Sequence, residues 1–188
     1  GRYSLSEKFS KALSDWVSKG NTLITIGTGS SWAVNTKFVK EKLIKVVSDS
    51  TTLTSRKPYV DAGENIGREA LGGVFLKGDM DLSHPLGFGY DQSRVALYKN
   101  NEVWLAPSKS AYGTVIDYAE KPHLDGYISE KNQREFLPKS ASLIVSPKGM
   151  GRVIMFADNP NFRGIHYGMN RLFLNAIFLG NHIEVPSE

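Results

Sequence analysis

The chain contains no cysteine, which excludes disulfides, thiolate metal sites and a cysteine nucleophile within its 188 residues. Its four histidines form neither an H-x-x-E nor an H-E-x-x-H pattern, so no local spacing indicates a zinc site. No apolar run reaches membrane-spanning length, because Asn175 interrupts the longest one. The net charge of +4 comes without a block of basic residues interleaved with aromatics. We therefore expect no metal or other cofactor, no nucleic-acid partner and no membrane insertion.

What is present suits one α/β domain. A content of 40% apolar residues supports a proper core, and we expect residues 1–188 to form a single domain. The chain begins inside an amphipathic pattern, which predicts a piece of a longer protein. Residues 48–73 are polar and irregular, which predicts an exposed excursion. The residue patterns predict a helix over 5–17, a strand over 22–26, a helix from Trp32 towards Val47, strands over 74–80 and 114–118, a hairpin of 94–98 with 102–105, a short helix over 127–137, a hairpin of 141–145 with 152–156, and a final helix over 169–179.

A glycine-rich turn, Gly27-Thr-Gly-Ser-Ser31, stands between the first strand and the second helix. This is the position of a nucleophile elbow or a phosphate loop, but the residues match neither G-x-S-x-G nor G-x-G-x-x-G. The favoured interpretation is a tight turn in which Ser30 or Ser31 caps the helix. Anion binding at the helix start, by Gly29 and the two serines, stays open as the alternative.

A second candidate region, Asp158-Asn-Pro-Asn-Phe-Arg-Gly164, follows the strand that ends near Phe156. Loops at the carboxyl ends of strands commonly carry function in α/β folds. This loop offers two amides, an Asp and an Arg. Asp79, Asp81 and Asp158 are the carboxylates whose burial would suit acid–base chemistry.

Three segments together carry a resemblance that covers nearly the whole chain: 20–27, 84–90 and 149–180. The most specific part is F-A-D-N-P-N-F-R-G followed by N-R-L-F-L-N-A. They resemble the C-terminal domain of bacterial zinc carboxypeptidases, which is similar to class I glutamine amidotransferases. The resemblance implies a three-layer flavodoxin-like sandwich with a largely parallel or mixed sheet, whose first strands lie upstream of Gly1. It also implies an N-terminal peptidase domain that holds the zinc, and a periplasmic or secreted location.

The catalytic positions of an active amidotransferase do not match. The resemblance places Gly27 where the nucleophilic cysteine would stand, and Asn159 and Asn161 where a histidine and a glutamate would stand. An amide cannot take up a proton near neutral pH as imidazole can, and it cannot stabilise an imidazolium as a carboxylate can. We therefore expect no catalytic residue in this chain.

These observations lead to one principal hypothesis and two alternatives. The principal one is a non-catalytic accessory domain that packs on, or regulates, the peptidase domain of the same polypeptide; the oligomeric state is left open. The first alternative is a ligand-binding module in the old amidotransferase cleft, for a peptide, a carboxylate or a glycan. Its candidate residues are Gly29, Ser30, Ser31, Asp158, Asn159, Arg163 and Tyr167. The second alternative is a serine hydrolase that pairs Ser30 or Ser31 with His166.

Overall fold

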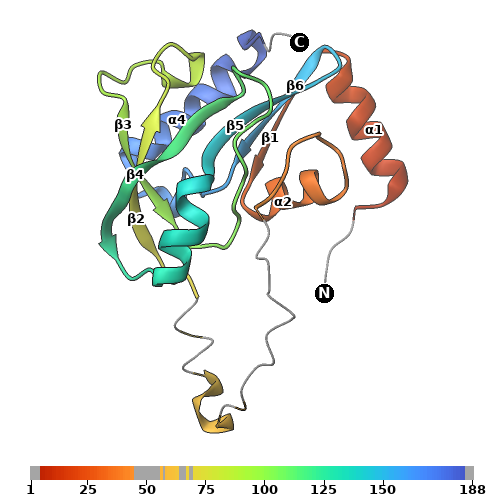
Figure 1. Ribbon diagram of the computed structural model, residues 1–188. Helices are drawn as coiled ribbons and strands as arrows, with labels where there is room; N and C mark the ends of the chain where they lie inside the picture. Colours follow the sequence, from red (N-terminus) through yellow and green to blue (C-terminus); the bar gives the residue numbers. More distant parts are fainter. Residues whose placement is uncertain (1–4, 45–55, 57, 64–66, 68–69, 185–188) are drawn as a thin grey trace.

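The computed structural model describes residues 5–44, 56, 58–63, 67 and 70–184. Within these residues six strands form one mixed sheet, with helices on both of its sides (Figure 1). The strands are β1 (Thr22–Ile26), β2 (Val74–Met80), β3 (Arg94–Lys99), β4 (Thr114–Gly126), β5 (Ala141–Lys148) and β6 (Gly151–Phe156). The helices are α1 (Glu7–Ser18), α2 (Thr28–Asn35) and α4 (Tyr167–Leu179), with short turns η1 (Tyr59–Asp61), η2 (Pro85–Gly87), η3 (Asn132–Phe136), η4 (Leu137–Lys139), η5 (Phe162–Gly164) and η6 (Gly180–His182). None of the helices in this described part is long and apolar enough to cross a membrane.

The sheet has the strand order β1-β6-β5-β4-β2-β3. Only β1 and β6 run parallel, and each of the other neighbouring pairs is antiparallel. The predicted α/β class and the mixed sheet are confirmed, whereas the largely parallel form of the prediction is not. The flavodoxin-like arrangement stays a prediction.

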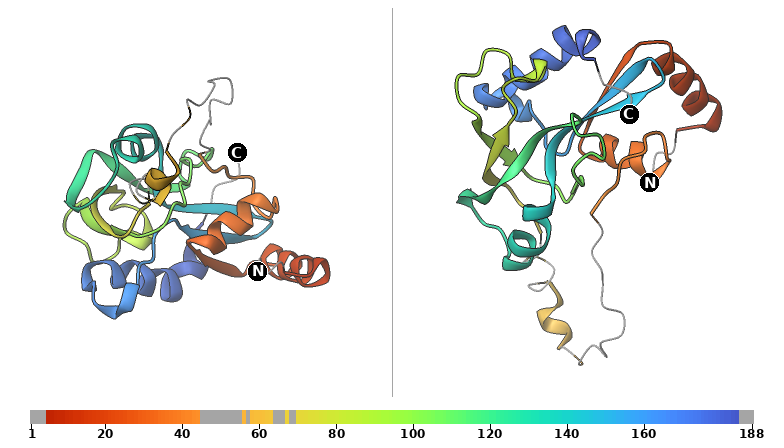
Figure 2. Two further views of the ribbon diagram at one scale, coloured as in Figure 1. Left: turned by 90° about the horizontal axis from the view of Figure 1, so that it is seen from below. Right: turned by 45° about the horizontal axis from the view of Figure 1, so that its top comes forward.

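Strand β6 lies at the centre of the core, because all of its residues are buried. Its side chains alternate between the two faces of the sheet. Val153 and Met155 belong to a cluster with residues of α1 and α2, and Ile154 and Phe156 belong to a second cluster with residues of α4. Figure 2 shows α4 on one side of β6, and α1 and α2 on the other. The region around β1 and β6 therefore has three layers.

Elements with strong local signals formed as expected. The Ser6 hydroxyl accepts a hydrogen bond from the Phe9 amide at 3.3 Å and caps α1, which ends before Gly20 at a φ of 111°. Strands β1 and β2 have the predicted bounds. The predicted hairpin of β5 and β6 is confirmed, with Gly149 at a φ of 61° in its two-residue turn.

The second helix is shorter than predicted. It ends at Asn35, the Thr36 hydroxyl donates back to the Trp32 carbonyl at 2.8 Å, and Lys37 takes a positive φ of 59°. A left-handed residue cannot continue an α-helix, so the apolar spacing through Phe38 and beyond does not produce one. Val47, the predicted end, lies outside the described residues.

The predicted hairpin of 94–98 with 102–105 is wrong. Strand β3 pairs with β2, and the second segment contributes only isolated bridges of Leu105 to Leu43 and to Ala141. The turn is held in another way, because the Asn101 side chain accepts from the Val103 amide at 2.9 Å and donates to the Ala157 carbonyl at 3.0 Å. These contacts turn the chain away from β3.

Two further segments differ in part from expectation. The short helix expected over 127–137 appears as a π-helical turn, η3, followed by η4. Much of the excursion expected over 48–73 lies outside the described residues. Of its described part, Tyr59 and Val60 are exposed, whereas Leu71 is buried in the core next to β2.

Candidate functional site

The turn after β1 has the geometry of a sharp strand-to-helix elbow. Gly27 has φ 53° and ψ −115°, a conformation that residues with a side chain rarely adopt. Its amide donates to the Phe156 carbonyl at 2.9 Å, which ties the elbow to the end of β6. An added Cβ would meet nothing closer than the Asn101 amide nitrogen at 3.8 Å. Backbone conformation, rather than lack of space, therefore favours glycine here.

Ser30 has a structural role that differs from the predicted helix cap. Its hydroxyl is buried, donates to the Phe156 carbonyl at 2.8 Å and lies 2.9 Å from the Thr25 hydroxyl. The N-cap position belongs to Gly27, without a side-chain hydrogen bond. Ser30 thus links α2 to the sheet, and its hydroxyl is committed to these contacts.

Asp158 is the centre of a buried polar network. One carboxylate oxygen accepts from Lys99 Nζ at 3.0 Å, and the other accepts from Tyr118 Oη at 2.6 Å and from Ser142 Oγ at 2.7 Å. The ammonium of Lys99 has no exposed surface and also donates to the Val103 carbonyl at 2.8 Å. Four segments of the sheet region therefore meet at one ion pair.

The electrostatics of this network are those of a closed structural site. Burial lowers the pKa of Lys99, and the ion pair with Asp158 opposes that shift. Burial and then the Asp158 carboxylate raise the pKa of Tyr118 well above its ordinary value. The Lys99 ammonium also lies 4.4 Å from the centroid of the Trp104 ring, which gives a cation–π contact. The members of this network are buried and bonded to one another, so they connect four segments of the chain and present no exposed group.

Sequence reasoning identified Asp158 but missed Lys99, Tyr118 and Ser142. The sequence carried one signal for Lys99, because it stands at every second position of β3 after Val95 and Leu97. In the structure all three side chains are buried. A strand's inward face continues at every second residue.

The rest of the 158–164 loop is built from local contacts. The Asn159 side chain accepts from the Asn161 amide at 3.0 Å. With its amide nitrogen turned towards the loop, Asn170 of α4 donates to the Asn161 side chain at 3.0 Å and to the Pro160 carbonyl at 3.1 Å. Arg163, exposed and at a φ of 52°, places its guanidinium 5.2 Å from the ring centroid of Phe162. In this orientation Asn170 connects the start of α4 to the loop.

The structure brings only some of the predicted ligand residues together. Ser30 and the Gly27 turn lie beside the end of β6, where both bond the Phe156 carbonyl. Asp158 follows Phe156 by two residues in the sequence. Tyr167 is 83% exposed at the start of α4. No hydrogen bond within the described residues joins Asn159, Arg163 or Tyr167 to the Gly27 turn.

Within the described chain, His166 does not pair with Ser30 or Ser31, and the histidines belong to no metal-binding group. The His166 ring packs on Phe75 at 5.0 Å and on Tyr98 at 5.1 Å between ring centroids, and no hydrogen bond joins it to Ser30 or Ser31. The pairing that a serine hydrolase requires is absent there. Among the described residues, no group of His, Asp and Glu is arranged to hold a metal ion.

Asp79, Asp81 and His84 have ordinary structural roles. Asp79 forms an exposed ion pair with Arg94 at 3.2 Å. Hydrogen bonds from Ser83 lower the pKa of Asp81, with the side-chain bond the largest cause. Burial lowers the pKa of His84, whose Nδ1 accepts from the Leu86 amide at 3.1 Å.

Two pockets, of about 470 and 660 Å³, flank the turn between β5 and β6 and share Pro147 and Gly149. Neither is lined by a residue of the Gly27 turn or of the 158–164 loop. A ligand-binding cleft between the Gly27 turn and the 158–164 loop therefore stays a prediction.

We compared the chain with protein-family models, with curated proteins and with solved structures, and none of these comparisons found a match. The family resemblance therefore rests on the sequence motifs alone.

Proposed function

We propose that this chain is a non-catalytic accessory domain that packs on a zinc carboxypeptidase-like domain of the same polypeptide and thereby positions it or restricts access to it. The observation that carries the proposal is a row of apolar side chains on one helix that the rest of this domain leaves about half exposed. The identity of the partner comes from the sequence resemblance, as does a periplasmic or secreted location.

This row, the α1 stripe, belongs to α1 and to Leu5, which precedes its cap and is 44% exposed. Phe9, Leu13 and Trp16 recur at helical spacing, and Phe9 and Trp16 are 52% and 47% exposed. Val17 is the one residue of α1 that is buried. An amphipathic helix ordinarily covers its apolar face, and each half-exposed ring forgoes roughly 1 kcal/mol of burial. The stripe is therefore suited to pack against another domain.

Strand β1, which lies next to α1 in Figure 1, supports an interface on the same side of the domain. It is an edge strand of the described sheet, and its sequence, Thr22–Ile26, contains no charged residue. Edge strands of independent domains commonly carry charges or proline that prevent further pairing. An uncharged edge next to an uncovered helix stripe fits a domain that continues into neighbouring structure.

The candidate site supports the non-catalytic part of the proposal. The elbow residue is Gly27, the Ser30 hydroxyl is committed to the sheet, and Asp158 is committed to Lys99. We expect the purified chain to show no glutaminase and no esterase turnover. Turnover that is lost on Ser30→Ala would refute this part.

Hydroxyl-radical footprinting tests the packing. We expect strong labelling of Phe9 and Trp16 in this chain and at least fivefold less in the longer polypeptide that includes the peptidase domain. Tyr112, which is 70% exposed on the β3–β4 connection, serves as the internal control and should label equally in both.

A variant pair gives a second test in the longer polypeptide. Phe9→Glu with Trp16→Glu should release this domain as a fragment in limited proteolysis, because two carboxylates cannot be buried at the interface without a partner. Tyr112→Glu should leave the cleavage pattern unchanged. Unchanged labelling of the α1 stripe in the longer polypeptide would overturn the proposal.

A further inference from the structure

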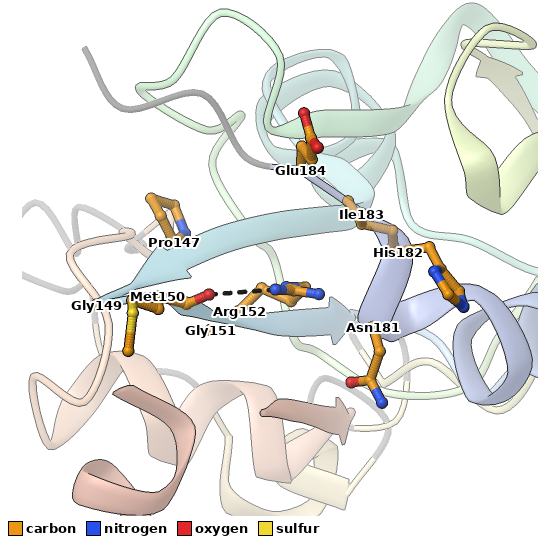
Figure 3. A pocket seen from close by; sticks show the side chains of 9 residues that line it. All are labelled: Pro147, Gly149, Met150, Gly151, Arg152, Asn181, His182, Ile183 and Glu184. Carbon is orange, nitrogen blue, oxygen red and sulfur yellow. Dashed lines mark hydrogen bonds between the residues drawn. The ribbon is translucent and has the colours of Figure 1, made fainter. Parts of the chain in front are cut away.

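A pocket at the opposite end of β6 from Asp158 contains a buried cation. The pocket has a volume of about 470 Å³ and lies between the β5–β6 turn and η6. Arg152, Met150, Asn181, His182 and Glu184 are among the residues that line it (Figure 3).

Arg152 is held in this pocket by the backbone. It is 8% exposed, its Nη1 donates to the Gly180 carbonyl at 2.9 Å, and its Nη2 donates to the Met150 carbonyl at 3.2 Å. Its Nε is buried without a hydrogen-bond partner. Two carbonyl contacts and the surrounding chain therefore fix the orientation of the guanidinium.

Within the described residues, Arg152 forms no ion pair, in contrast to the buried Lys99 with its Asp158 partner. A buried charge without a counter-charge is costly, and in folded proteins such a group is usually paired. Glu184 also lines the pocket, but its side chain points away from Arg152 in Figure 3. The pocket thus has a fixed positive charge whose partner is not supplied by the described residues.

We propose that this pocket binds the carboxylate of a small organic acid or of a peptide C-terminus, with Arg152 as its counter-charge. The two backbone contacts use one donor each of Nη1 and Nη2, so the planar guanidinium keeps further N–H donors of the kind that binds a carboxylate. The volume is within the range of small-molecule pockets. This inference does not depend on the accessory function, because none of the residues that line the pocket belongs to the α1 stripe or to β1.

NMR titration of the intact chain tests the inference. The probe is N-acetylalanine, followed through the Nε–Hε signal of Arg152 at constant ionic strength. We expect a saturable shift of this signal. N-acetylalanine amide, which has the same shape without the charge, should bind at least tenfold more weakly.

Arg152→Lys keeps the positive charge but loses the fork, and we expect its affinity for N-acetylalanine, followed through backbone amides, to fall about tenfold. Arg134→Lys, on the exposed η3 turn, is the matched control and should bind as the unmodified chain does. If Arg152→Lys does not fold, the comparison of acid with amide in the unmodified chain decides. Equal binding of acid and amide, silence of the Arg152 signal, or a response to inorganic phosphate without one to N-acetylalanine would each overturn the inference.

Discussion

The buried ion pair of Lys99 and Asp158 gives the sharpest prediction for stability. Asp158→Asn keeps the size of the side chain but leaves the Lys99 ammonium, which has no exposed surface, without its counter-charge. Removal of one partner of a buried pair typically costs about 3–5 kcal/mol, because the remaining charge stays in a medium of low polarity. We expect Asp158→Asn to lower the free energy of unfolding by about 4 kcal/mol, a large part of the 5–15 kcal/mol typical of a domain.

The same reasoning predicts that a second substitution restores stability. Lys99→Met in the Asp158→Asn background removes the unpaired ammonium and puts an apolar chain of similar length in its place. We expect the double variant to regain at least about 1 kcal/mol relative to Asp158→Asn alone, because apolar replacements of buried pairs are often close to neutral.

Urea unfolding, followed by tryptophan fluorescence, measures these differences at constant slope. The matched control is Asp79→Asn, because Asp79 pairs with Arg94 at 3.2 Å with side chains 47% and 65% exposed. An exposed pair contributes only about 0.2–1 kcal/mol. A cost for Asp158→Asn as small as that for Asp79→Asn, or a double variant no more stable than Asp158→Asn, would refute the reasoning.

Two further predictions concern a close backbone approach and a carboxylate with a lowered pKa. Gly151→Ala should cost about 3 kcal/mol in urea unfolding, because its Cβ would overlap the Val17 carbonyl oxygen of α1. Gly168→Ala, whose Cβ meets nothing within 4 Å in α4, should be neutral or stabilising by up to about 1 kcal/mol, and equal losses for both would contradict the argument. The Ser83 hydroxyl lowers the pKa of Asp81, so this carboxylate adds stability above its unfolded-state pKa that is lost as the pH falls. Ser83→Ala should raise the pKa of Asp81 in an NMR titration of its carboxyl carbon and weaken that acid dependence, and an unchanged titration would contradict the assignment.

The elements that sequence analysis predicted well depend on contacts between near neighbours. The Ser6 cap and Gly20 set the ends of α1, and β-branched residues with a following glycine set β1. The Gly149 turn fixes the register of the β5–β6 hairpin, because a two-residue turn allows only one pairing. Each of these signals lies within a few residues of the element that it determines.

The pairing of β3 depended on distant residues and was therefore missed. Nothing in the 94–105 segment reveals that β2, some twenty residues earlier, is the partner of β3. The π-helical form of η3 was missed for a different reason, because periodicity alone does not distinguish one helix type from another.

For the candidate site, the sequence by itself determined which side chains are available: no cysteine exists in the chain, glycine stands at the elbow, and asparagines follow β6. The tertiary structure alone decided the environment of the charges that remain. It gave Asp158 a buried lysine from β3, left Arg152 buried without an ion pair in the described chain, and left the α1 stripe half-exposed. The sequence specifies each residue type, whereas the burial and the interaction partners of a side chain are set only when strands remote in the sequence come together.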